Sequence, residues 1–399
     1  MGVRKSNPIE VREGVANFFE NHFKNVAWRG PKIFELPLKK LSDVERESLE
    51  EIFSKEEVWT ALTSCGGNKA PSPDGFNLNF IKDNWEVIGD DFMKFMEDFH
   101  RNGSVLEELN MSFIALIPKC INSKTMKDFR PISLVGALYK ILAKVLASRM
   151  RKVINLVDGE SQMAFVRNRQ ILDSFVIAEE IIHQWKKSRE GRVLVKLDFG
   201  KAYDSLDHSF LDFMLKEMGF GWRWRKWVGC CISTSRLSVL VNGSPTRQFG
   251  MERGLRQGDP LSPFLFNVAA EGLSAVFKKA EAMDLMKGIS FGGNVVHVSH
   301  MHFKDDTILF LQPGVEYLRN VRRILMCYEV ASGLRINFQK SYVVKIRKRK
   351  EREVNWATVF KSSKASLPIS YLGFSLGSHP GSKLFWSDLV QCIEFHLAP

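Results

Sequence analysis

The chain of 399 residues has few cysteines and no long uncharged apolar run. A chain of this length can bury a substantial core, which excludes a small disulfide-stapled fold. Its six cysteines are scattered, with one adjacent pair and no Cys-x-x-Cys spacing, which indicates reduced thiols and no zinc site. The most apolar stretch, residues 263–277, is interrupted by Asn267 and Glu271, so no membrane-spanning helix is predicted. No apolar signal segment follows the first ten residues. We expect a nuclear or cytoplasmic protein that is not secreted and has no membrane partner.

Internal repeats and low-complexity tracts are also missing, and the 45% hydrophobic and 26% charged residues are typical of a globular protein. The length predicts two or three domains, or one large fold with subdomains. The chain has 57 lysines and arginines but only 45 aspartates and glutamates, which gives a net charge of +12. This excess favours nucleic acid as the partner over an acidic membrane surface.

Several segments have the periodicity of a defined element. Apolar residues recur at helical spacing in residues 15–23, 44–62 and 137–153, whereas residues 192–199 alternate as a strand does and place Asp198 near the strand's end. Residues 68–75 (NKAPSPDG) are rich in turn formers. The run 222–227 (WRWRKW) is typical either of a helix that covers a core, which we favour, or of stacking platforms for single strands.

The carboxylates suggest chemistry. Apolar residues flank Asp305 and Asp306, which predicts a β-hairpin with both carboxylates at its tip. Clustered carboxylates repel one another unless cations compensate them, and Mg²⁺ prefers oxygen ligands. Two such ions about 3.5 to 4 Å apart can stabilise the attacking and leaving oxygens of a phosphoryl transfer. An Asp-Asp pair alone is weak evidence, because exposed Asp-Asp turns are common.

Ordered motifs surround these aspartates: residues 129–134 (FRPISL), 196–205 (KLDFGKAYDS), 254–263 (GLRQGDPLSP), 303–306 (FKDD), 333–341 (GLRINFQKS) and 371–374 (YLGF). In this order they resemble the motifs of a reverse transcriptase, specifically of the non-LTR, LINE-type retrotransposons as found in plants. The resemblance covers residues 61–377. It implies an α+β right-hand polymerase, with fingers and a palm whose antiparallel sheet presents the metal-binding aspartates.

The resemblance implies an RNA-directed DNA polymerase that extends a DNA primer on an RNA template with deoxynucleoside triphosphates. Asp198, Asp305 and Asp306 match the catalytic ligands of two Mg²⁺ ions, which Mn²⁺ can replace. Lys340 matches a candidate proton donor to the pyrophosphate leaving group. The nucleotide-binding candidates are Tyr203, at the sugar-gate position, with Phe199, Gln257, Arg256, Arg130 and Lys119. Residues 371–374 resemble a primer-grip turn.

Plainer interpretations stay open for several of these residues. Tyr203 fits a core aromatic, Arg130 a structural ion-pair partner and Lys340 a surface lysine. The basic run 345–352 (KIRKRKER) fits a solvated linker, a segment facing nucleic acid or a nuclear-import signal. The sequence leaves the oligomeric state undetermined.

The chain also departs from the family pattern. Lys304 precedes the aspartate pair where a small residue is usual, and we expect it to impair metal binding. We expect residues 1–60 to form a helical extension or linker, residues 61–377 the reverse transcriptase domain, and residues 378–399 the start of a largely missing thumb. Upstream endonuclease and downstream RNase H or zinc-knuckle regions are not visible. The alternative function is a catalytically degenerate, nucleic-acid-binding relic of the same fold.

Overall fold

The computed structural model describes residues 7–25, 35–67, 72–166, 169–187, 191–291, 296–346 and 355–378, with Trp386, Val390 and Glu394. The chain divides into two compact units, each built from separated segments. Unit 1 comprises Met1–Arg29, Lys39–Val157 and Tyr203–Ala269; unit 2 comprises Gly30–Leu38, Asp158–Ala202 and Ala270–Pro399. Both mix helices with sheets, so the expected α+β class is confirmed.

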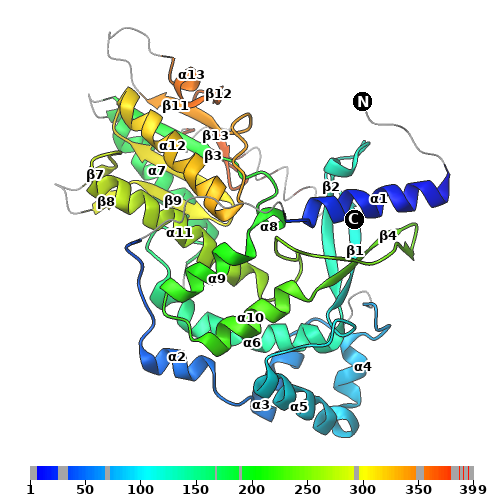
Figure 1. The fold of residues 1–399 in the computed structure, drawn as a ribbon. Coiled ribbons are helices and arrows are strands. Elements are labelled where there is room, and N and C mark those ends of the chain that lie inside the picture. The colour runs from blue at the N-terminus through cyan, green and yellow to red at the C-terminus, as the bar shows by residue number, and fades with distance from the viewer. Residues whose placement is uncertain are drawn as a thin grey trace. The chain divides into compact units, whose positions relative to one another are not determined.

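Unit 1 contains most of the helices (Figure 1). They are α1 (Pro8–Phe23), α2 (Asp43–Leu49), α3 (Lys55–Thr63), α4 (Leu78–Asp83), α5 (Trp85–Asn102), α6 (Ala137–Val157), α9 (His208–Glu217) and α10 (Trp222–Ser233). The short α8 (Ala202–Ser205) and the long α11 (Ser262–Ala282) run across the division between the units. The helix predicted for residues 44–62 is two helices, because Ser54 caps α3 and accepts a hydrogen bond from the Glu57 N–H.

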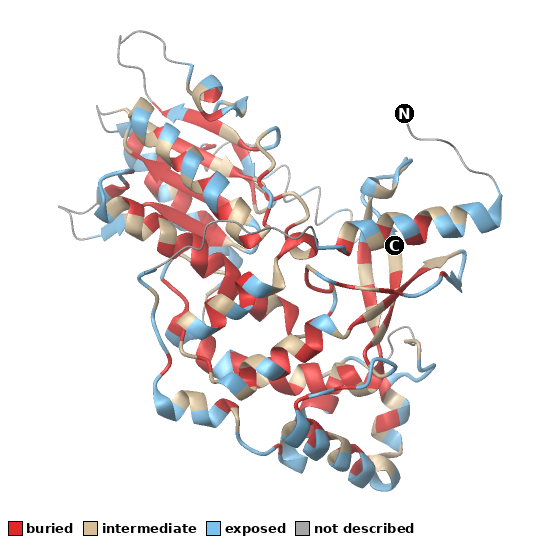
Figure 2. Cartoon of the chain, in the orientation of Figure 1, coloured by how far each residue is buried: buried red, intermediate tan, exposed pale blue. Residues whose placement is uncertain are grey.

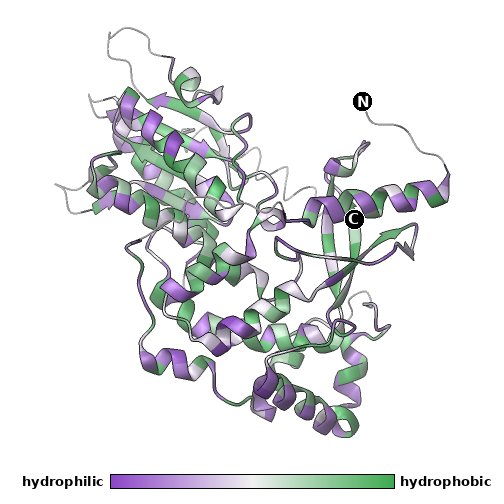
Figure 3. Cartoon of the chain, viewed as in Figure 1, coloured by the Kyte–Doolittle hydropathy of each residue, from purple (hydrophilic) through white to green (hydrophobic). Residues whose placement is uncertain are grey.

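The sheet of unit 1 has the order β2-β1-β4-β5, and β6 also pairs with β4. Its strands are β1 (Met111–Pro118), β2 (Phe129–Val135), β4 (Arg236–Val241), β5 (Ser244–Pro245) and β6 (Phe249–Gly250). β1 pairs antiparallel with β2 and parallel with β4. Helix α1 packs against this sheet through Phe19 and Phe23, which share an apolar cluster with Leu237 and Phe249. Figure 3 shows hydrophilic and hydrophobic residues interspersed along α1, as a helix with one packed face requires.

Unit 2 is organised around a sheet of order β12-β11-β3-β10-β9. Its strands are β3 (Arg192–Leu197), β9 (His300–Phe303), β10 (Asp306–Leu311), β11 (Tyr342–Ile346) and β12 (Ser363–Lys364). All neighbours pair antiparallel except β11 and β12, which are parallel. The expected antiparallel sheet is therefore confirmed, with one parallel edge pair. The central strands are mostly buried (Figure 2).

The other elements of unit 2 are helices α7 (Ile171–Lys187), α12 (Val315–Ser332) and α13 (Trp356–Phe360), with the two-stranded pairs β7 (Ile289–Phe291)/β8 (Val296–Val298) and β13 (Ile369–Tyr371)/β14 (Phe374–Leu376). Trp185 of α7 and Tyr371 of β13 share an apolar cluster with Leu194 and Phe310 from the central strands. This cluster anchors the strands that carry the candidate aspartates.

The structure decides between the two interpretations of residues 222–227. Trp224 and Trp227 are fully buried in α10, whereas Trp222 is 66% exposed. The favoured packing interpretation is confirmed for the two inner tryptophans. The turn-rich segment 68–75 is described only from residue 72, and the basic run 345–352 only up to Ile346, where it forms the end of β11. Within the described residues, no helix is both long and apolar enough to cross a membrane.

Candidate active site

Two of the candidate carboxylates lie opposite each other across the central strands of unit 2. Thr307 of β10 pairs with Leu197 of β3. Asp306 directly precedes Thr307 and Asp198 directly follows Leu197, so the antiparallel register brings both aspartates to the same end of the sheet. The predicted strand before Asp198 is confirmed. The predicted hairpin is confirmed as well, but only Asp305 lies in its turn, because Asp306 is the first residue of β10.

The hairpin turn itself consists of Lys304 and Asp305, because Phe303 pairs directly with Asp306. Lys304 has φ +56°, a left-handed conformation that costs an L-residue about 1 kcal/mol and that glycine adopts freely. The Lys304 ammonium lies 5.2 Å from the ring centre of Phe165 and 6.0 Å from that of Phe303. Both distances are within the range of cation–π attraction, so the rings hold the side chain against the protein surface.

Electrostatic repulsion between the aspartates contributes to the pKa values of Asp198 and Asp305. Partial burial is the main cause that raises the pKa of Asp198, and Asp306 adds to it, while Lys340 and Lys196 act in the opposite direction. Loss of hydration also raises the pKa of Asp305, with further contributions from Asp306 and Asp198. Each negative charge therefore disfavours ionisation of its neighbours, and a cation near this end of the sheet would relieve that repulsion.

Lys196 is a site residue that the sequence reasoning missed. Its ammonium lies 3.1 Å from Asp306 Oδ1, and its side chain is only 16% exposed. Burial alone lowers the pKa of Lys196, but Asp306, Tyr342 and Asp198 outweigh burial, so the pKa is raised. The strand period was the available signal, because Asp198 directly follows β3 and lies two residues after Lys196, which places both side chains on the same side of the extended backbone.

The segment after α12 holds the backbone around Asp198. The Asp198 N–H donates to Ser341 Oγ at 3.0 Å, and the Asn337 N–H donates to the Asp198 carbonyl at 2.8 Å. Phe199 and Ile336 form an isolated antiparallel bridge, which places the Phe199 backbone in this contact, and the Phe199 side chain is buried. Lys340 is exposed and lowers the pKa of Asp198, so the candidate proton donor lies within electrostatic reach of the carboxylates.

The three candidate ligands, Asp198, Asp305 and Asp306, are of a type that suits magnesium, because Mg²⁺ prefers carboxylate oxygens. Within the described parts of the chain, however, no three Asp, Glu, His or Cys side chains gather closely enough to hold a metal ion. Asp306 is turned to Lys196, which occupies one of its oxygens. The convergence of all three carboxylates on cations therefore stays a prediction.

In unit 1, the ring of Tyr203 stacks on the ring of Phe266 from α11, with centroids 4.8 Å apart and planes 10° apart. Gln257 is half-buried in the segment before α11, and its Nε2 donates to Asp204 Oδ1 at 2.8 Å. Both candidates therefore have defined orientations that contacts from other elements set.

Arg256 requires a correction. We expected it to contact the nucleotide, but its side chain is 2% exposed and forms an ion pair of 2.9 Å with Asp259. Its guanidinium also donates to Asn110 Oδ1 and to the Cys231 carbonyl, and it lies 4.1 Å from the ring centre of Tyr139. Its donors are instead engaged inside unit 1, where Arg256 supports the loop that carries Gln257.

Lys119 and Arg130 lie at the end of the β1/β2 hairpin where residues 119–128 connect the two strands. Arg130 pairs with Ile117 in the register, and both cationic side chains are exposed. The Lys119 ammonium donates to the Lys127 carbonyl at 2.9 Å. Among the described residues, no acidic side chain forms an ion pair with Arg130, so the structural ion pair considered for it is not seen there.

The proposed primer-grip segment forms the turn between β13 and β14. Leu372 and Gly373 both have positive φ values, +53° and +84°, and Tyr371 is fully buried. The turn is therefore a tight hairpin whose first residue is anchored in the core of unit 2.

Comparison with known proteins places these elements in a family. Residues 118–376 match the family model described as "Reverse transcriptase (RNA-dependent DNA polymerase)". The chain belongs to the reverse transcriptase family. The match contains every aspartate and nucleotide-binding candidate named above.

Two relatives of this chain are named as proteins of transposable elements. It is 26% identical, over 98% of its length, to the "Transposon TX1 uncharacterized 149 kDa protein" of Xenopus laevis. It is also 26% identical, over 74% of its length, to the "Retrovirus-related Pol polyprotein from type-2 retrotransposable element R2DM" of Drosophila melanogaster. These names confirm the resemblance to LINE-type elements; the plant kind stays a prediction. The chain spans 30% and 27% of the lengths of these two relatives.

Proposed function

We propose that this chain is the RNA-directed DNA polymerase core of a non-LTR retrotransposon. The observation that carries the proposal is the register of β3 and β10, which brings Asp198 and Asp306 to one end of the sheet beside the Asp305 turn. The reaction joins the primer 3′-hydroxyl to the α-phosphorus of a deoxynucleoside triphosphate. The bond to the bridging oxygen breaks, and pyrophosphate leaves.

Asp198, Asp305 and Asp306 would hold two divalent cations, Mg²⁺ or Mn²⁺. When bound, the cations supply charge stabilisation for the attacking and leaving oxygens. The chain's own part is to fix the carboxylates: Ser341 and Asn337 hold the backbone of Asp198, and Lys196 pairs with Asp306. Lys340, exposed beside Asp198, would donate a proton to the departing pyrophosphate.

In unit 1 we assign the nucleotide contacts to Tyr203, Gln257, Arg130 and Lys119, with Phe199 as the buried neighbour of Asp198 in unit 2. Stacking on Phe266 holds the Tyr203 ring, and a rigid ring can exclude a ribose 2′-hydroxyl. The exposed cations of the β1/β2 hairpin suit the triphosphate or the nucleic-acid backbone. Tyr203→Val should raise the ratio of ribonucleotide to deoxynucleotide incorporation by about tenfold, which is about 1.4 kcal/mol.

For the domains, we propose residues 61–377 as the polymerase domain. The fingers would include the β1/β2 hairpin, and the palm the sheet of unit 2. RNA template and DNA primer are the proposed partners, in the nucleus or the cytoplasm. Because phosphate neutralisation supplies most of the affinity, binding should fall steeply as salt rises.

Extension of an oligo(dT) primer on poly(rA) tests this proposal. We expect metal-dependent incorporation of dTTP with Mg²⁺ or Mn²⁺, none with excess chelator, and none with Asp198→Asn. Asp212→Asn is the matched control, because Asp212 is an exposed aspartate of α9 that pairs with Arg225. Duplex binding without incorporation by the wild-type chain would support the degenerate relic instead.

A further inference from the structure

Asp204 and His22 lie beside a nucleotide-binding candidate, yet the proposed reaction gives them no task. His22 is in the N-terminal helix α1, and Asp204 directly follows Tyr203. We propose that both are positioning residues that fix the Gln257 amide, so that α1 is a working part of the nucleotide site. This inference rests on the proposed function, because it takes Gln257 as a nucleotide contact.

Asp204 is 2% exposed, and other side chains engage both of its carboxylate oxygens. Oδ1 accepts a hydrogen bond from Gln257 Nε2 at 2.8 Å, and Oδ2 lies 3.1 Å from His22 Nε2. A buried carboxylate is costly unless hydrogen bonds satisfy it. The two contacts therefore link His22 of α1 to Gln257 through the Asp204 carboxylate.

These hydrogen bonds determine which amide atom of Gln257 faces the nucleotide site. An ionised carboxylate only accepts hydrogen bonds, so the Gln257 amide nitrogen must face Asp204. The amide oxygen is then directed elsewhere, and the described parts of the chain show no hydrogen-bond partner for it. An acceptor at this position suits a hydroxyl group of the nucleotide sugar and disfavours an anionic phosphate.

The loop that carries Gln257 is fixed against the same elements. The Gly254 N–H donates to the Leu206 carbonyl, and the Leu255 N–H donates to the Tyr203 carbonyl. Gly254 has φ +86°, and a Cβ atom there would lie 2.6 Å from the Asp204 carbonyl oxygen. The Ser133 N–H donates to the Gln257 carbonyl at 2.7 Å. With the backbone held on both sides, the side-chain contacts decide the remaining freedom of the amide.

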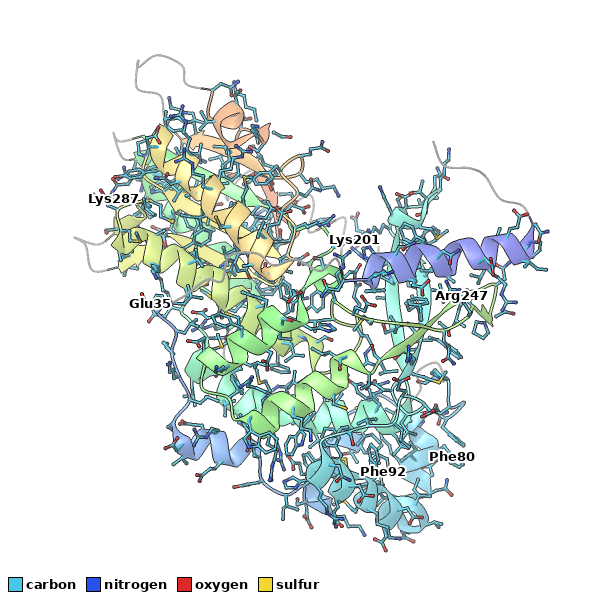
Figure 4. The ribbon with its side chains drawn as sticks, viewed as in Figure 1. Glu35, Phe80, Phe92, Lys201, Arg247 and Lys287 are labelled. Carbon is cyan, nitrogen blue, oxygen red and sulfur yellow. The ribbon has the colours of Figure 1, made fainter. Side chains whose placement is uncertain are left out.

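Helix α1 docks independently of His22. Its apolar face packs on β4 and β6, and Arg247 forms an ion pair with Glu20 at 2.6 Å. Figure 4 labels Arg247 beside α1. The guanidinium of Arg253 donates twice to the His22 carbonyl, which pins the end of the helix. His22 can therefore be replaced without removing the contacts that dock the helix.

The test measures the dissociation constant of dTTP from the full chain bound to poly(rA) and a dideoxy-terminated oligo(dT) primer, with Mg²⁺ present. The dideoxy end prevents bond formation, so binding is read without turnover. We expect Asp204→Asn to weaken dTTP binding about tenfold, because its amide can donate toward Gln257 and release the fixed orientation. His22→Ala should weaken it about threefold, and His22→Gln should restore it.

Two comparisons isolate positioning from a merely structural contribution. In a Gln257→Ala background, Asp204→Asn should cause no further loss of dTTP binding, because there is no amide left to orient. Glu20→Gln removes another contact of α1 and should leave dTTP binding within twofold. Duplex affinity should stay within twofold in all variants.

Unchanged dTTP binding in a folded Asp204→Asn chain overturns the inference, as does an equal loss in the Gln257→Ala background. If Asp204→Asn does not fold, His22→Ala decides in the same way. Failure of the proposed function looks different: the wild-type chain then does not extend a normal primer, whatever the variants do to binding. A wild-type chain that binds no dTTP overturns both.

Discussion

Two clusters of charged side chains, one in each unit, differ in how far they are buried and in whether their charges are paired. In unit 1, Arg256 and Asp259 are 2% and 4% exposed and bonded to each other, with Tyr139 donating to Asp259 at 2.7 Å. In unit 2, Asp305 is exposed, and the pKa values of Asp305 and Asp198 are raised. The first cluster is closed because its charges compensate each other. The second is open, and its like charges repel one another.

The difference teaches that motif membership alone does not assign a task. Arg256 and Asp259 belong to one of the ordered motifs, as the aspartates do, yet both are buried and paired with each other. Removal of a partner from a closed cluster should cost stability. Removal of a carboxylate from an open cluster should cost activity alone.

The largest expected effect tests the open cluster. Asp305→Asn should lower primer extension at least a thousandfold, because an anionic metal ligand is lost. The free energy of unfolding should stay the same or rise, because repulsion with Asp198 and Asp306 is relieved. Extension rates and urea unfolding measure the two quantities. A variant that loses both activity and stability would contradict the distinction.

The matching change in the closed cluster is Arg256→Met. It leaves Asp259 buried and unpaired by charge, so the free energy of unfolding should fall by about 3 to 5 kcal/mol. Arg225→Met is the control, because the Arg225–Asp212 pair lies at the surface and should contribute no more than about 1 kcal/mol. Urea unfolding of both variants gives the comparison, and equal losses would refute it.

A third region contains titratable groups that are buried and uncharged. His300 and His302 are 3% and 1% exposed, and burial lowers the pKa of His302 to about 3 and that of His300 well below its usual value. Nearby Lys278 acts in the same direction on both, while Thr307 Oγ1 lies 2.7 Å from His302 Nδ1.

The histidines protonate near pH 6.5 in the unfolded chain but stay neutral at that pH in the folded chain. Their contribution to the free energy of unfolding is therefore fully present above about pH 6.5 and is lost as the pH falls. Between pH 7 and 5.5 the free energy of unfolding should drop by about 2 kcal/mol from this pair. A chain with glutamine at both positions should lose correspondingly less. An identical pH dependence of the two proteins would exclude the histidines as its source.

The smallest effect concerns Lys304 at the edge of the open cluster. Lys304→Ala should lower the Mg²⁺ concentration for half-maximal extension about threefold, because a cation beside the carboxylates is removed while solvent screens an exposed charge. Lys304→Gly should do the same and gain about 1 kcal/mol of stability, because φ is +56°. Lys361→Gly, at φ +58° in the same unit, should gain stability without changing the Mg²⁺ requirement. If Lys304→Ala leaves extension unchanged, Lys304 is not what limits this chain.

The sequence alone determined the local structure around the carboxylates. Alternation in residues 192–199 and the apolar runs beside Asp305 and Asp306 are properties of neighbouring residues, so the strand and the hairpin followed from them. Helix α6 followed from its apolar stripe in the same way. These features need only short-range periodicity, and the ordered motifs added the family.

Tertiary structure alone decided which charges are enclosed and which stay open. The burial of Arg256, the pairing of Lys196 with Asp306 and the contact of His22 with Asp204 join residues whose partners lie on other elements. The residues in the last contact are 182 positions apart in the chain. Periodicity shows which face of an element is apolar, but solvation and pairing depend on what packs against that face. The sequence could therefore identify the candidate carboxylates, but only the fold distinguishes the exposed cluster around Asp305 from the buried Arg256–Asp259 pair.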